Sequence, residues 1–149
     1  MSHTSQITSV IITDEIALKS AIQELKENGV KCDLLENAVP RSYYGSRQEG
    51  MNQAARYVVY LPTSKYDVGL YPSDKGKGFT ARTDFYSGQV ESVLGAAVGE
   101  GDDYEQARLG KLYQMYAVHA ATRRAVQQGY RVSRLTKSDG TIQLRVATA

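Results

Sequence analysis

The sequence predicts a single α+β domain over residues 1–149, with an antiparallel sheet and one long and one shorter helix packed on one of its faces. Two observations lead to this class. Short runs rich in β-branched and aromatic residues are separated by glycine and proline, which is typical of strands joined by tight turns. Two other segments repeat apolar residues every three or four positions, which is typical of helices. The arrangement lacks the five-strand pattern of an OB fold.

A strand, a helix and a second strand are expected first. Residues 6–13 are rich in β-branched side chains and predict the first strand. Thr13 or Asp14 is placed to cap the helix, and the Asn-Gly pair at 28–29 ends it. Residues 30–38 predict the second strand. The apolar face of the helix is expected to consist of Leu18, Ala21, Ile22 and Leu25.

Three further strands follow in the middle of the chain. Residues 55–62 and 65–72 each read as a strand, and residues 79–85 alternate and pair with the strand before them. The turn between the last two, DKGKG at 74–78, is basic and glycine-rich. Its Gly-Lys-Gly lacks the rest of a phosphate-loop motif and precedes a strand, so we interpret it as a plain hairpin turn.

Two helices are expected in the second half of the chain. Residues 90–98 predict one or two helical turns, and Asp102 with Glu105 resembles a capping box in front of a long helix. Gly129 closes that helix. Its apolar residues recur at helical spacing and predict one continuous buried face. This face is expected to consist of Leu109, Leu112, Tyr113, Tyr116, Ala117, Ala120 and Ala121.

A hairpin is expected at the end of the chain. Residues 130–137 and 141–148 flank Ser-Asp-Gly at 138–140, which is a strong turn signal. Side chains alternate along the last strand. One face is predicted to carry Ile142, Leu144 and Val146, and the other Thr141, Gln143 and Arg145.

Composition bounds the class of protein. No apolar run is long enough for a transmembrane helix, and the polar N-terminus does not resemble a secretory signal, so we expect a cytoplasmic protein with no membrane contact. Cys32 is the only cysteine, which excludes an intramolecular disulfide and favours a structural thiol in a half-buried strand.

The sequence offers little for catalysis. Its two histidines, His3 and His119, have no partner at metal-ligand spacing, and no nucleophile-elbow, zinc-protease or Walker motif is present. The carboxylates at 100–103 are better explained by helix capping. We therefore expect no enzymatic activity, no metal and no cofactor.

Charge is spread unevenly although the net charge is only +2. Residues 41–86 carry a net charge of +3 and residues 123–149 carry +5, whereas 1–40 and 87–122 are each −3. If the two basic segments fold side by side, they form one positive face that attracts phosphate backbones without reading sequence. A solvated surface of mixed charge is the alternative.

The stretch PRSYYGSRQ at 40–48 combines both requirements of a single-strand binder. Tyr43 and Tyr44 lie between Arg41 and Arg47, and no apolar neighbours claim the two rings for a core. Cations neutralise the phosphates of a single strand, and aromatic rings stack on its bases. The glycine at position 45 allows the loop to bend.

The candidate nucleic-acid-binding residues extend from this loop along the chain. The expected phosphate contacts are Arg41, Arg47, Arg56, Lys65, Lys75, Lys77 and Arg82. The expected stacking residues are Tyr43, Tyr44 and Tyr66. The path is expected to continue through Arg131, Arg134 and Arg145. Other tyrosines have a competing role as core, and these are Tyr57, Tyr60, Tyr71, Tyr113 and Tyr116.

Short motifs in a fixed order give a family resemblance. The chain begins Met-Ser-His and carries Tyr-Asp-Val-Gly-Leu at 66–70, Gln-Met-Tyr-Ala at 114–117, Gly-Tyr at 129–130 and Asp-Gly-Thr-Ile at 139–142. This order resembles an uncharacterised family found in cyanobacteria, red-algal plastids and phages. The match covers most of the chain except about 37–62, and the family as a whole implies no activity.

One phage branch of that family implies a role. The chain is similar to the Drc-like single-stranded-DNA-binding cofactors of phage RNA polymerase. The resemblance implies a homo-oligomer, expected to be a tetramer, with a fold unlike the OB fold, acting in the host cell cytoplasm. It implies no site residues. The alternative is an adaptor with a Tyr-rich partner-binding face and no contact with nucleic acid.

Overall fold

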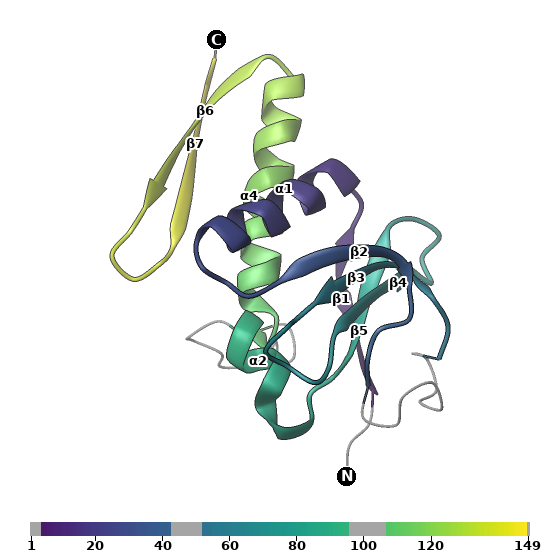
Figure 1. Ribbon diagram of the computed structural model, residues 1–149. Helices are drawn as coiled ribbons and strands as arrows, with labels where there is room; N and C mark the ends of the chain where they lie inside the picture. Colours follow the sequence, from purple (N-terminus) through teal and green to yellow (C-terminus); the bar gives the residue numbers. More distant parts are fainter. Residues whose placement is uncertain (1–3, 43–51, 96–106, 149) are drawn as a thin grey trace.

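The computed structural model describes residues 4–42, 52–95 and 107–148 (Figure 1). It confirms the α+β class. The strands are β1 (Thr4–Ile12), β2 (Asp33–Ala38), β3 (Ala55–Tyr60), β4 (Val68–Pro72), β5 (Phe79–Asp84), β6 (Tyr130–Thr136) and β7 (Ile142–Thr148). The helices are α1 (Glu15–Glu27), the 3₁₀ turn η2 (Tyr86–Gly88), α2 (Gln89–Leu94) and α4 (Gly110–Gln127).

Five strands form one open antiparallel sheet in the order β1-β5-β4-β3-β2. The strands from β2 to β5 are a simple meander, and β1 adds to the outer edge of β5. Because β1 and β2 lie at opposite edges, α1 crosses the sheet between them (Figure 1). Within the described residues, β1 and β2 have no second strand partner, so the sheet is not a closed barrel, which separates it from the OB fold.

The first helix begins and ends where the sequence predicts. The Asp14 side chain accepts a hydrogen bond from the Ala17 backbone N–H at 3.0 Å, which satisfies a free donor of the first turn. Gly29 follows the last turn with a φ of +90°, a conformation that glycine adopts without strain. The predicted apolar face is buried in full.

The main core lies between the helices and one face of the sheet. It joins the apolar faces of α1, α2 and α4 to alternate residues of the central strands, including Tyr57, Val59, Val68 and Leu70. A smaller cluster of Ala55, Val58 and Tyr71 lies outside this core. Side chains therefore alternate between a helix-covered face and a face turned away from the helices.

The buried face of α4 differs from the predicted one. Ala117 and Ala121 are exposed, whereas Met115 and Val118 are buried. The helix contacts α1 on one side and α2 and the β6–β7 hairpin on others. The larger side chains gain more from burial than alanine does, so they decide which side of the helix is covered.

The C-terminal hairpin is a sheet of its own. Among the described residues β6 pairs only with β7, with Arg134 opposite Leu144, and the pair extends beside α4 away from the five-stranded sheet (Figure 1). The expected hairpin and its turn at 138–140 are therefore present. The predicted capping box of Asp102 and Glu105 lies outside the described residues.

Candidate nucleic-acid interface

Arg41 is held by a buried carboxylate at the start of the predicted binding loop. Its Nε and Nη2 donate to the two Asp67 oxygens at 2.9 and 2.7 Å, and its backbone N–H donates to Asp67 at 2.9 Å. The Asp67 carboxylate also accepts from the Leu61 N–H at 3.2 Å. The hydrogen bond to Asp67 raises the pKa of Arg41. Two of the side-chain donors expected to reach phosphate, Nε and Nη2, are thus engaged within the protein, although the side chain is partly exposed.

Arg56 is likewise committed to carboxylates. Its guanidinium lies 3.3 Å from Glu36 and 3.6 Å from Glu15, and stacks 4.5 Å from the centre of the Tyr57 ring. Burial, and then the hydrogen bond to Glu15, raise the pKa of Tyr57 to about 12. Two neighbouring negative charges cancel the attraction that Arg56 would have for phosphate.

Tyr66 does not face solvent. Its side chain is 6% exposed and belongs to the main core, where its ring meets the edge of Tyr86 at 6.5 Å. This overturns the expectation that Tyr66 stacks on a base, because a ring next to the buried strand β4 gains more from the core than from solvent. The neighbouring Lys65 is exposed, as predicted for a phosphate contact.

Arg82 lies on the sheet face turned away from the helices. Its guanidinium is 4.7 Å from the centre of the Tyr71 ring, and Arg41 is at the same distance from Tyr60. Tyr71 is only 6% exposed and its hydroxyl donates to the Gln53 carbonyl at 2.9 Å. Burial raises the pKa of Tyr71. Here the cations already have aromatic partners within the chain.

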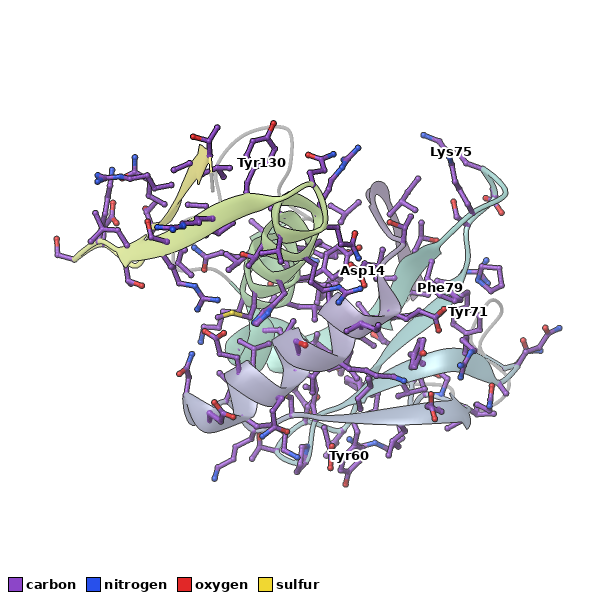
Figure 2. The ribbon with its side chains drawn as sticks, turned by 90° about the horizontal axis from the view of Figure 1, so that it is seen from above. Asp14, Tyr60, Tyr71, Lys75, Phe79 and Tyr130 are labelled. Carbon is purple, nitrogen blue, oxygen red and sulfur yellow. The ribbon has the colours of Figure 1, made fainter. Side chains whose placement is uncertain are left out.

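The β4–β5 turn contains two exposed lysines. Lys75 and Lys77 are both exposed, and Figure 2 shows Lys75 pointing away from the molecule at the tip of the turn. The turn is closed by a hydrogen bond from the Ser73 N–H to the Gly78 carbonyl at 3.0 Å. Its position agrees with the predicted hairpin turn.

The β6–β7 hairpin separates its arginines between two faces. The inner face turns toward the helices: Ile142 packs against the main core, and Arg134 donates to Glu24 at 2.6 Å. The strand register assigns the alternate residues to the opposite side. This outer face consists of Arg131, Ser133, Leu135, Gln143, Arg145 and Ala147.

Cations and an exposed apolar side chain meet on the outer face. Arg131 and Arg145 are exposed and make no ion pair with another described residue. Leu135 is 52% exposed on this face, one pair along from Arg145. A shallow hollow of about 200 Å³ there is lined by Ser133, Arg134, Leu135, Gln143 and Arg145. No acidic residue belongs to this face.

The hairpin also contains two candidate binding residues that were not predicted from the sequence, Lys137 and Leu135. Lys137 stands exposed at the turn, between two basic strands, which was a usable signal. Leu135 lies four residues after Arg131 in the same strand, so alternation alone places both on one face, and the register adds Arg145 to that face.

The predicted residues thus form separate groups and not one path. The basic segments 41–86 and 123–149 do not join into a single positive face, because the hairpin lies beside α4 and away from the sheet (Figure 1). In Figure 2, Lys75 and Tyr130 likewise lie on different parts of the molecule. Tyr43, Tyr44 and Arg47 lie outside the described residues.

Most of the described tyrosines serve the core. Tyr57, Tyr66, Tyr71, Tyr113 and Tyr116 are all less than a tenth exposed. Tyr86 and Tyr130 are the large exposed rings of the described segments, at 43% and 41%. The adaptor alternative requires a Tyr-rich face for a partner, and the described residues supply few exposed tyrosine rings for such a face.

No protein-family model, curated protein or solved structure matches the chain. Within residues 4–42, 52–95 and 107–148, no three histidine, cysteine or acidic side chains gather as they would around a metal ion. None of the helices there combines the length and apolar character that a membrane crossing requires.

Proposed function

We propose that this protein binds single-stranded DNA with little sequence preference and acts as a cofactor of a phage RNA polymerase. The observation that carries DNA binding is the outer face of the β6–β7 hairpin, where Arg131 and Arg145 are exposed and no acidic side chain belongs to that face among the described residues. Such cations bind phosphates by releasing counterions, which is independent of base sequence.

The apolar part of the same face supports a single strand over a duplex. Leu135 is 52% exposed on the outer face of the hairpin, where the pair Leu135–Gln143 lies next to the pair Ser133–Arg145. An exposed apolar side chain gains from contact with unstacked bases, which a duplex keeps paired inside. Tyr43 and Tyr44 supply the stacking rings of the proposal, on the strength of the sequence alone.

The transcriptional role is supported by the sequence motifs and not by the hairpin surface. The polymerase partner, the homo-oligomer, the tetrameric state and the host cytoplasm all rest on the ordered motifs at 66–70, 114–117 and 139–142. In this proposal the protein has no catalytic activity and holds the displaced strand for the polymerase.

Fluorescence anisotropy tests the DNA-binding part. Labelled single-stranded and duplex DNA of one sequence are titrated with the protein at low and at moderate salt. We expect tight binding to the single strand, weak binding to the duplex, and a steep loss of affinity as salt rises. Absence of binding to either DNA at low salt would overturn the proposal.

A further inference from the structure

Strand β7 has a free edge. Among the described residues it pairs only with β6, so its other side presents backbone N–H and C=O groups without strand partners. A free edge is a template for another strand, and an isolated two-stranded hairpin has only marginal stability in water. The hairpin therefore gains from one more strand at this edge.

The inner face of the hairpin is covered at one end only. Ile142 packs against the main core, whereas Val146, four residues further along the same face, is 52% exposed. Leu144 between them is half-buried. The helices thus leave the far end of this apolar row uncovered.

The sequence of β7 is complementary to itself when it runs antiparallel. With Leu144 on a two-fold axis, Leu144 faces its own copy and Ile142 faces Val146 of the second chain. On the outer face, Arg145 then lies opposite Gln143, so no like charges meet. All three apolar residues find apolar partners in this register.

The neighbouring symmetric registers are worse. An axis at Arg145 places the two arginines opposite each other and leaves Ile142 opposite Thr148, which costs both charge repulsion and apolar contact. An axis at Gln143 places Val146 opposite Gly140 in the turn. The axis at Leu144 is therefore the register that the side chains favour.

We propose that β7 pairs antiparallel with β7 of a second copy of this chain, with Leu144 at the two-fold axis. The pairing makes a four-stranded sheet and covers Val146. It also puts Arg131 and Arg145 of both copies on one face, so that the second copy contributes half of the cations. That consequence rests on the proposed DNA-binding function, whereas the pairing itself does not.

Two variants test the pairing without DNA. Sedimentation equilibrium compares the wild type with Val146→Lys over a wide range of protein concentration, and circular dichroism checks that the variant is folded. Because Val146 is exposed in the single chain, lysine is tolerated there but opposes a second strand. We expect the wild type to self-associate and the variant to have half its mass. A monomeric wild type, or an equal mass for both, overturns the pairing.

Cysteine cross-linking tests the register. Residues directly opposite in antiparallel strands have Cα atoms about 4.5–5.5 Å apart, within the range of a disulfide. Leu144→Cys is expected to form a disulfide-linked dimer on oxidation. Ala147→Cys is the control, because its own copy lies six residues away along the strand, roughly 20 Å. Cys32 is buried and present in both. Equal or reversed yields overturn the register.

Discussion

The Arg41 guanidinium donates two hydrogen bonds, of 2.9 and 2.7 Å, to the two oxygens of the buried Asp67 carboxylate. Its Nη2 also donates to the Leu61 carbonyl at 2.9 Å. The Asp67 N–H returns a hydrogen bond to the Arg41 carbonyl at 3.1 Å. These contacts tie the chain after β2 to the connection between β3 and β4. They give Arg41 a structural role that competes with the predicted phosphate contact.

Arg41→Ala is therefore expected to destabilise the fold. It leaves the Asp67 carboxylate, which is nearly inaccessible, without its counter-charge. Losing one partner of a fully buried pair costs about 3–5 kcal/mol, and an exposed pair is worth about 0–1. Because Arg41 is partly exposed, we expect a loss of roughly 2 kcal/mol in urea unfolding. Arg131→Ala, an exposed control, should change the free energy of unfolding by no more than about 0.5 kcal/mol.

Gly69→Ala is expected to be costly for a steric reason. An added Cβ would lie 2.6 Å from Cε2 of Tyr71 and 2.9 Å from Cγ of Pro40. Crowding of this kind costs about 1–3 kcal/mol. Tyr71→Leu in the same chain should relieve part of the cost, so a double-mutant cycle measured by urea unfolding should give a non-zero coupling. Strict additivity of the two substitutions would contradict this contact.

Glu24 couples the hairpin to α1 and is expected to make stability depend on pH. Burial opposes the charged form, but hydrogen bonds from Arg134 and His119 outweigh it and lower the pKa of Glu24 from its ordinary 4.5. Because the pKa of Glu24 is lower in the folded protein than in the unfolded chain, its ionised carboxylate stabilises the fold at pH values above the unfolded pKa. That contribution is lost as pH falls below about 4.5 and through the folded pKa.

Glu24→Gln should remove this dependence. Charge-assisted hydrogen bonds are worth about 1.5–3 kcal/mol, so we expect the variant to lose roughly 2 kcal/mol at pH 7 and little at pH 3. Urea unfolding at both pH values measures the difference. Glu27→Gln is the control, because Glu27 is exposed on the same helix. An equal effect of the two substitutions at pH 7 would show that the Glu24 contacts do not stabilise the fold.

The paired tyrosines of the 40–48 loop have a separate test. Tyr43→Ala combined with Tyr44→Ala should weaken binding to single-stranded DNA while the protein stays folded. Each stacked base is worth about 1–3 kcal/mol, so the loss for two rings is about 30-fold or more in affinity. Anisotropy measures affinity, and circular dichroism checks folding. Unchanged affinity would mean that these rings do not stack on DNA.

Local signals were sufficient for most secondary structure. The α1 helix was predictable from Asp14 at its start and Gly29 after its end, because both act through contacts within one turn. The hairpins were predictable because alternation and turn residues lie close together in the sequence. The strands β3 to β5 follow the same rule.

Long-range partners were beyond those signals. Arg41 and Asp67 are 26 residues apart, and Glu24 and Arg134 are 110 apart, so no local pattern connects them. Arg41 has no acidic residue close to it in the sequence, so it was predicted to be available for phosphate, whereas the fold brings Asp67 to it. Tyr66 was misassigned for the same reason, since its core neighbours come from other elements.

The outer face of the hairpin was predictable only in part. Arg131 and Arg145 were identified from composition, and the alternation along β7 was identified as well. Alternation along β6 separates Arg131 from Arg134, which faces Glu24 on the inner side, and the strand register was needed to place Arg145 on the face of Arg131. Charge counting cannot assign residues to faces, because faces depend on pairing.

The most direct test of the account is the salt dependence of single-strand binding when the two outer-face arginines are removed together. Arg131→Ala with Arg145→Ala is compared with Lys19→Ala and Lys26→Ala, which removes the same charge from exposed positions on α1. Anisotropy is measured over a series of salt concentrations. Each phosphate contact contributes about 0.7 to the slope of log affinity against log salt for single strands.

We expect the arginine variant to bind more weakly and to have a slope shallower by roughly 1.4, for two lost contacts. The lysine variant should keep the slope of the wild type. The same slope in the arginine variant and in the wild type would contradict the hairpin as the DNA-binding surface.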